Sequence, residues 1–294
     1  MNVGVYLPSG GLEQAAGVAV YARGAEDAGL ESVWVGDHLI ARDRPFLDST
    51  LRMATAAAVT ERVRIGFGVM ILALRPVAWA AKQIASLQHL SGGRVLLGVG
   101  TGGAVHGDAG WRAAGVPYAE RGARTDAALA VLPGLVRGEA VELADGEVTL
   151  SPGAPMPPVL IGGGPAAMRR AARFGDEWYP AFSDPARIGP AAEKLAALAA
   201  EYGRPAPRLT VSVSVGLGDV PAERIDAQVR GLTEYGMTAD EARAALVTGT
   251  PERAAERFAA LAEAGAHRVI AMPFPGDHLR QIELVGEAAA LLRR

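Results

Sequence analysis

Short apolar runs alternate with longer helical patterns along the whole chain. We predict strands, from apolar runs bounded by turn residues, at 3–7, 32–36, 62–70, 94–99, 158–161, 177–179, 209–215 and 267–272. We predict helices, from apolar positions at helical spacing, at 14–28, 50–59, 76–90, 118–136, 165–173, 186–202, 251–264 and 277–292. Eight strand–helix pairs predict an α/β protein with a (β/α)8 TIM barrel, and a doubly wound open sheet is the alternative.

The whole chain, residues 1–294, is expected to form one barrel domain. A barrel of this kind needs about 250 residues, and the chain has 294, of which 50% are hydrophobic. Residues 218–248 are polar and only partly helical, so we expect an insertion there. Residues 140–150 carry the Asp145-Gly146 turn signal of a small hairpin.

Composition and charge remove several classes of partner. The net charge is −3 with no block of like charges, so we expect neither nucleic acid nor a membrane surface as partner. The chain has no cysteine, which excludes disulfides, thiolate metal sites and a cysteine nucleophile. No histidine pair has ligand spacing, so we expect no metal site. The N-terminal residues lack a charged signal-peptide region and no apolar run approaches a membrane span, so a cytoplasmic location is expected.

Polar and glycine-rich motifs follow three of the predicted strands. They are Asp37-His38, the Gly-Val-Gly-Thr-Gly-Gly run at 98–103, and Gly162-Gly163-Gly164-Pro165. The carboxyl ends of all barrel strands open onto one face, which carries the active site of such enzymes. Motifs far apart in the sequence are therefore predicted to converge on one pocket.

The glycine motifs indicate a ligand that approaches the backbone closely. The run at 98–103 formally matches a dinucleotide fingerprint, but the residues after it predict a loop instead of the helix that the fingerprint requires. Gly162–Gly164 opens a helix, where exposed N–H groups favour phosphate, and the proline takes up none of those donors. A tight turn without a ligand is the alternative at both places.

His38 is the best candidate for a catalytic side chain, because it follows a buried strand on the predicted active face. His106 lies in the glycine-rich loop and could reach the same mouth. His267 begins a strand, which places it at the opposite end of the barrel.

Taken together, five segments resemble the bacterial luciferase-like monooxygenase family, and most closely its branch that uses the deazaflavin coenzyme F420. They are residues 25–38, 60–103, 115–124, 158–180 and 250–273. The resemblance implies a (β/α)8 barrel, a homodimer and a cofactor at the C-terminal mouth. It places Asp37 and His38 beside the cofactor ring. It implies a bulge at Gly68-Val69 that backs the ring, often through a non-prolyl cis peptide in the family. For the cofactor's linker and phosphate it implies Thr101, Gly102, Gly103, Gly162, Gly163 and Gly164.

The resemblance implies an oxidoreductase that moves a hydride between F420 and a small organic substrate. His38 would donate a proton or orient the ring, and Asp37 would fix the ring or the His38 tautomer. The first alternative is an FMN-dependent monooxygenase using oxygen, for which a separate cofactor reductase is a further expected partner. A non-catalytic flavin-binding relative is the second alternative, and a barrel aldolase or isomerase the third. Sugar-phosphate dehydrogenases of the family carry a glutamate where this chain has Gly103, which counts against that substrate class.

Overall fold

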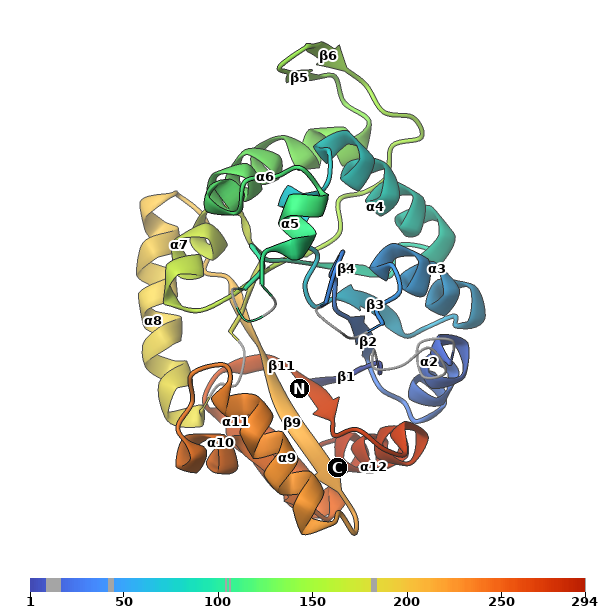
Figure 1. Cartoon of the computed structure of the whole chain (residues 1–294), viewed down its shortest axis with the longest axis vertical. Coiled ribbons are helices and arrows are strands. Elements are labelled where there is room, and N and C mark those ends of the chain that lie inside the picture. The colour runs from blue at the N-terminus through green and yellow to red at the C-terminus, as the bar shows by residue number, and fades with distance from the viewer. Residues whose placement is uncertain (9–16, 42–44, 104, 106, 181–183, 294) are drawn as a thin grey trace.

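The computed structural model describes residues 1–8, 17–41, 45–103, 105, 107–180 and 184–293, and it contains a closed parallel barrel surrounded by helices (Figure 1). The strands of the barrel are β1 (Asn2–Tyr6), β2 (Ser32–Val35), β3 (Arg64–Phe67), β4 (Val95–Val99), β7 (Val159–Gly162), β8 (Glu177–Tyr179), β9 (Arg208–Leu217) and β11 (Ala266–Pro273). Each pairs in parallel with its neighbours in the order β9-β11-β1-β2-β3-β4-β7-β8, and a β8–β9 pairing closes the ring. The predicted (β/α)8 barrel is therefore confirmed, and the open-sheet alternative is wrong.

Helices follow the strands on the outside of the ring (Figure 1). They are α2 (Val18–Asp27), α3 (Ser49–Val59), α4 (Val77–Ser91), α5 (Ala109–Ala113), α6 (Arg121–Arg137), α7 (Pro165–Phe174), α8 (Pro185–Glu201), α9 (Ala222–Thr233), α10 (Ala239–Ala245), α11 (Pro251–Glu263) and α12 (His278–Leu291), with short 3-10 turns η1 (Leu72–Leu74) and η3 (Tyr118–Glu120). The predicted hairpin is confirmed as β5 (Val141–Leu143) and β6 (Gly146–Val148), which stands away from the barrel in Figure 1. None of the described helices is long and apolar enough to cross a membrane.

Two elements, the short helix α5 and the strand β10, were not expected from the sequence. The glycine-rich loop contains the short helix α5, whose Trp111 is buried against Ile71 and Ala73. Residues 218–249 contain α9, α10 and a further strand, β10 (Leu246–Gly249). The N-terminal part of β9 pairs with β8, and β10 pairs with its C-terminal part from Ser214 to Leu217. The segment thus extends the barrel wall, and its status as an insertion stays a prediction.

Side chains inside the ring form layers. At the N-terminal end, Arg268 is 1% exposed and bonds to Glu177 at 2.5 Å and Glu31 at 3.1 Å. His267 also lies at this end, because it bonds to Asn2 at the start of β1, as the sequence predicted. Above these charges lies an apolar layer of Trp34, Leu96, Leu160, Tyr179 and Ile270. The interior is thus filled below the mouth, so a ligand has room only at the C-terminal end.

Glu26 of α2 ties the outer layer of helices to the loop before β3. Its carboxylate accepts hydrogen bonds from the backbone N–H groups of Glu61, Arg62 and Val63 at 2.6–3.2 Å. Partial burial by itself would raise the pKa of Glu26, but these donors lower it below its ordinary value. The ionised form is therefore the one that the fold stabilises.

We expect Glu26→Gln to destabilise the protein by about 1–2 kcal/mol at neutral pH, because hydrogen bonds to a charged acceptor are lost. The sign follows from linkage: a carboxylate with a lowered folded-state pKa stabilises above its unfolded pKa, and this stabilisation is lost as pH falls through the folded-state pKa. Urea unfolding of both proteins from pH 7 downward measures the difference. The two curves should converge at acid pH below about 4, and a difference independent of pH would contradict the assignment.

Candidate active site

The predicted site residues all lie at the carboxyl ends of barrel strands. Asp37 and His38 follow β2, and Gly68 and Val69 follow β3. The others follow β4 and β7, and they are Thr101, Gly102, Gly103, Gly162, Gly163 and Gly164. Because the strands are parallel, these ends form one mouth. The structure therefore brings together the motifs that the sequence predicted to converge.

A bulge after β3 carries Val69 into the mouth. The Gly68–Val69 peptide bond is cis, as the family resemblance implied. Gly68 N–H donates to the Val35 carbonyl at 2.7 Å, and Met70 N–H donates to the Gly98 carbonyl at 2.8 Å. The half-buried Val69 side chain packs against the apolar layer inside the barrel. The bulge is thus anchored to both neighbouring strands.

Three glycines make the space that Val69 occupies. A Cβ at Gly162 would lie 2.7 Å from Val69 Cγ1, and one at Gly100 would lie still closer to Val69 Cγ2. A Cβ at Gly98 would lie 3.3 Å from Val69 Cγ1 and would overlap the Phe67 carbonyl oxygen. Gly162, predicted as a cofactor-binding residue, is thus required first for packing inside the protein.

Asp37 is bound on every side by the protein itself. Its side chain is 4% exposed and accepts hydrogen bonds from Ser49 Oγ at 2.8 Å and from the Ile71 N–H at 2.8 Å. Arg75 binds both carboxylate oxygens, at 2.6 and 2.7 Å. These contacts tie the end of β2 to the start of α3 and to the chain after the bulge. Asp37 therefore holds the backbone of the mouth in position. Its predicted contact with the cofactor stays a prediction.

His38 follows Asp37 on the rim, where it is half-buried. Its ring meets Phe46 edge-on, with the ring centroids 5.1 Å apart. Because Asp37 is held rigidly, the backbone that carries His38 is also fixed. His106, the other candidate for this mouth, lies outside the described residues.

Two tyrosines of the mouth were missed by the sequence reasoning. Tyr6 at the end of β1 donates from its hydroxyl to the Gly68 carbonyl at 2.8 Å. Burial raises the pKa of Tyr6 well above its ordinary value, with the neighbouring Tyr179 acting in the same direction. Burial also raises the pKa of Tyr179, at the end of β8, to about 12. Both phenols therefore stay protonated near neutral pH. The sequence places both tyrosines at the ends of strands. A pattern of apolar residues alone does not show which residues at a strand end point into the barrel.

The glycine motifs leave backbone exposed at two places on the rim. Gly102 adopts a left-handed φ of +69°, and Gly103 beside it is exposed with open space where a Cβ would be. Gly163 and Gly164 are exposed at the start of α7. However, the Gly163 N–H already donates to the Tyr179 carbonyl at 3.2 Å. An anion at this helix start would be met by the N–H groups of Gly164 and Ala166.

Helix α9 lies beside β9 on the mouth side of the barrel (Figure 1). Gln228 of this helix donates to Ser214 Oγ of β9 at 3.2 Å. Tyr235, just after α9, is close enough to influence the pKa of Tyr6 electrostatically. Residues 218–249 therefore lie against β9 and bring Tyr235 within electrostatic reach of Tyr6.

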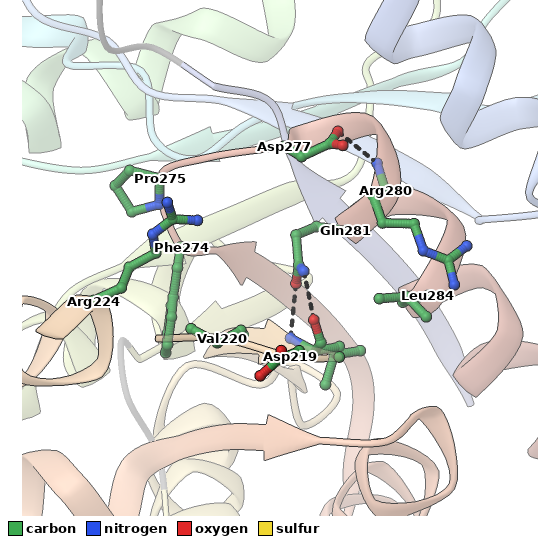
Figure 2. A pocket seen from close by; sticks show the side chains of 12 residues that line it. Asp219, Val220, Arg224, Phe274, Pro275, Asp277, Arg280, Gln281 and Leu284 are labelled. Atoms are coloured by element: carbon green, nitrogen blue, oxygen red, sulfur yellow. Dashed lines mark hydrogen bonds between the residues drawn. The ribbon is translucent and has the colours of Figure 1, made fainter. Parts of the chain in front are cut away.

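A separate cavity of about 310 Å³ lies on the rim between the ends of β9 and β11 and helix α12 (Figure 2). Phe274 and Arg224 line it, and Gln281 crosses it by bonding to both backbone groups of Leu217. It contains none of the predicted site residues. No three His, Asp or Glu side chains within the described ranges gather as metal ligands would.

Comparison with known proteins agrees with the fold and shows the family. Residues 1–243 match the model of the luciferase-like monooxygenase family. The chain belongs to this family. Within it, the chain is 32% identical over 228 residues to 4-hydroxyprotoasukamycin monooxygenase of Streptomyces nodosus subsp. asukaensis, covering 70% of this chain and 60% of that protein.

A second luciferase-like relative is an F420-dependent glucose-6-phosphate dehydrogenase of Amycolatopsis mediterranei. The chain is 34% identical to it over 167 residues, which cover 53% of this chain and 50% of that protein. This chain spans about half to three fifths of the length of the curated relatives it matches. The fold is similar to that of an F420-dependent secondary alcohol dehydrogenase in complex with an F420-acetone adduct, with a TM-score of 0.84, 19% identity and coverage of 100% and 99% of the two chains.

Proposed function

We propose that this luciferase-like protein is an F420-dependent oxidoreductase that transfers a hydride between the deazaflavin and a small organic substrate. The observation that carries the proposal is the mouth itself, where His38 follows the end of β2, the Gly68–Val69 bulge follows the neighbouring strand β3, and glycine backbone is exposed at Gly103 and at Gly163-Gly164. The names of the dehydrogenase relatives support F420 as the cofactor.

The residues of the mouth fit such a cofactor. A planar ring needs an apolar backing, and Val69 with Tyr179 offers one above the filled barrel interior. A phosphate needs backbone donors, and the exposed start of α7 offers those of Gly164 and Ala166. Thr101, Gly102 and Gly103 would line the linker between ring and phosphate. Open space at the Cβ positions of Gly103 and Gly164 leaves room for a ligand against the backbone.

The cofactor would supply the hydride, and the chain would supply binding, orientation and protons. His38 would hold or deliver a proton at the substrate oxygen, since it is the imidazole at the rim. Asp37 and Arg75 would keep the His38 backbone and the bulge in fixed positions. Gly103 stands where sugar-phosphate dehydrogenases carry glutamate, so we propose a substrate other than a sugar phosphate.

An FMN-dependent monooxygenase is the second candidate function, supported by the name of the Streptomyces relative. Both candidates use the same mouth, and they differ in the cofactor that binds. Cofactor preference is therefore the property to measure first.

A paired fluorescence titration of the purified protein with F420 and with FMN tests the proposal. Saturation by F420 at micromolar concentration, with FMN weaker, is the expected result. Tighter binding of FMN would transfer the assignment to the monooxygenase, and binding of neither would overturn both candidates.

Gly164→Asp makes the titration site-specific. Aspartate is a favoured residue at a helix N-cap, and the Cβ has open space, so the fold should be retained. The added carboxylate should repel a bound phosphate and weaken F420 binding by about tenfold or more. Gly189→Asp in α8 is the matched control, because its Cβ also meets open space. Equal F420 affinity in the two variants would contradict the phosphate position.

A further inference from the structure

Arg52 of α3 is a buried cation whose donors are mostly unsatisfied. The side chain is 2% exposed, and its Nη2 donates to the Pro8 carbonyl at 2.6 Å. Its Nε and Nη1 atoms are buried without a hydrogen-bond partner among the residues that the structure describes. The ion pairs found within the described ranges do not include Arg52. A buried guanidinium without an acceptor is costly, and such a group calls for an explanation.

Two other arginines, the buried Arg268 and the half-buried Arg94, have every side-chain nitrogen engaged. Arg268 bonds to Glu31, Glu177 and the Thr210 hydroxyl. Arg94 donates to the carbonyls of Ala57, Thr60, Val63 and Ser91. The fold therefore satisfies guanidinium groups where they serve only structure. Arg52 departs from that pattern.

Arg52 lies at the mouth, where it contacts the same aromatic ring, that of Phe46, as His38 does. Its guanidinium carbon is 5.9 Å from the centroid of the Phe46 ring, and His38 meets that ring edge-on at 5.1 Å. Phe46 also lies against Gly36 at the end of β2, and Pro8 follows β1. The unsatisfied donors are thus held between two strand ends on the active face.

We propose that Arg52 recognises a carboxylate of the substrate and holds it beside His38. A guanidinium with free N–H groups in a low-dielectric site is the strongest carboxylate partner that a protein offers. The bound anion would supply the acceptors that Nε and Nη1 lack. Because Arg52 is only 2% exposed, side chains that cover it must move aside for the carboxylate to reach it. The inference rests on the proposed function in one respect: it takes the mouth to be the substrate site.

Benzoate and its neutral analogue benzamide are the probes, used with the cofactor-free protein. Nitrogen-15 NMR of the arginine Nε–H groups follows Arg52 directly, and its resonance is identified by its loss in Arg52→Met. We expect benzoate to shift this resonance and to bind about tenfold more tightly than benzamide, the effect of one charged hydrogen bond. A resonance that benzoate leaves unmoved across the titration, or equal binding of the two probes, would overturn the proposal.

Variants separate recognition from structure. Arg52→Met removes the charge at similar length and should abolish the preference for benzoate, whereas Arg52→Lys should keep part of it. Arg94→Lys is the matched control, because it alters a half-buried arginine whose donors are satisfied and should leave the preference intact. A preference that survives in Arg52→Met would overturn the proposal. Where Arg52→Met does not fold, loss of the resonance in Arg52→Lys identifies it, and its response to benzoate in the wild-type protein still decides.

The carboxylate could also belong to the cofactor, since F420 is itself anionic. The dissociation constant of F420 for Arg52→Met distinguishes the two sources. An unchanged dissociation constant for F420, together with a lost preference for benzoate, supports a carboxylate of the substrate. A tenfold or larger rise in that constant would overturn the proposal and assign Arg52 to the cofactor. Benzoate binding needs no F420, so it can succeed or fail independently of the cofactor titration.

Discussion

Gly98→Ala is expected to prevent the barrel from reaching its native state, with a loss of more than about 4 kcal/mol. The new methyl group would overlap the Phe67 carbonyl oxygen of the neighbouring strand. That strand cannot move away freely, because Gly98 also accepts a hydrogen bond from Met70 across the bulge. Soluble yield and urea unfolding followed by circular dichroism measure the effect.

Gly103→Ala is the matched control for this substitution. It makes the same change five residues later, where a Cβ meets nothing within 4 Å, so stability should stay within about 0.5 kcal/mol of the parent. Gly162→Ala should fall between them, because its methyl group meets only the Val69 side chain. Val69→Ala should partly rescue Gly162→Ala and leave Gly98→Ala unrescued. A Gly98→Ala protein of near-parental stability would contradict this packing.

The strand–helix order could be predicted from the sequence because it depends on local periodicity. Each barrel strand is a short run buried on both faces, as Val95–Val99 shows, and each helix carries its own apolar spacing. The strand-end positions of Asp37, His38 and the glycines followed from that order. Helix α5 was missed because five residues rich in glycine and alanine carry too weak a periodic signal.

Contacts between distant residues could not be predicted in the same way. The glycines at 98, 100 and 162 suggested a ligand, yet they surround Val69, because only the folded barrel brings the bulge beside them. Asp37 suggested chemistry, yet Arg75 lies 38 positions along the chain and holds both its oxygens. Strand β10 was missed because a run of four residues directly after helix α10 is too short to show an alternation, and its pairing with β9 decides its structure.

His38→Ala is expected to lower kcat by about 10²–10⁴-fold while F420 still binds, if this imidazole transfers a proton in the reaction. The hydrogen bonds that anchor the bulge join backbone groups, from Gly68 to Val35 and from Met70 to Gly98. Oxidation of reduced F420 with small carbonyl compounds, and reduction of F420 with small alcohols, are the first assays. A fall in affinity with unchanged kcat would instead mean that His38 orients the ring.

His267→Ala serves as the control for His38→Ala because its effect should be confined to stability. His267 lies at the opposite end of the barrel, where it bonds to Asn2. His38→Gln separates the proton-transfer role further: it keeps a polar side chain that cannot carry a proton between groups, so it should lose kcat as His38→Ala does. Turnover by His38→Ala equal to that of the parent would contradict the catalytic assignment.

Cofactor binding without turnover in the parent protein would favour a non-catalytic member of the family, since the same contacts hold the mouth together whether or not a proton is transferred there.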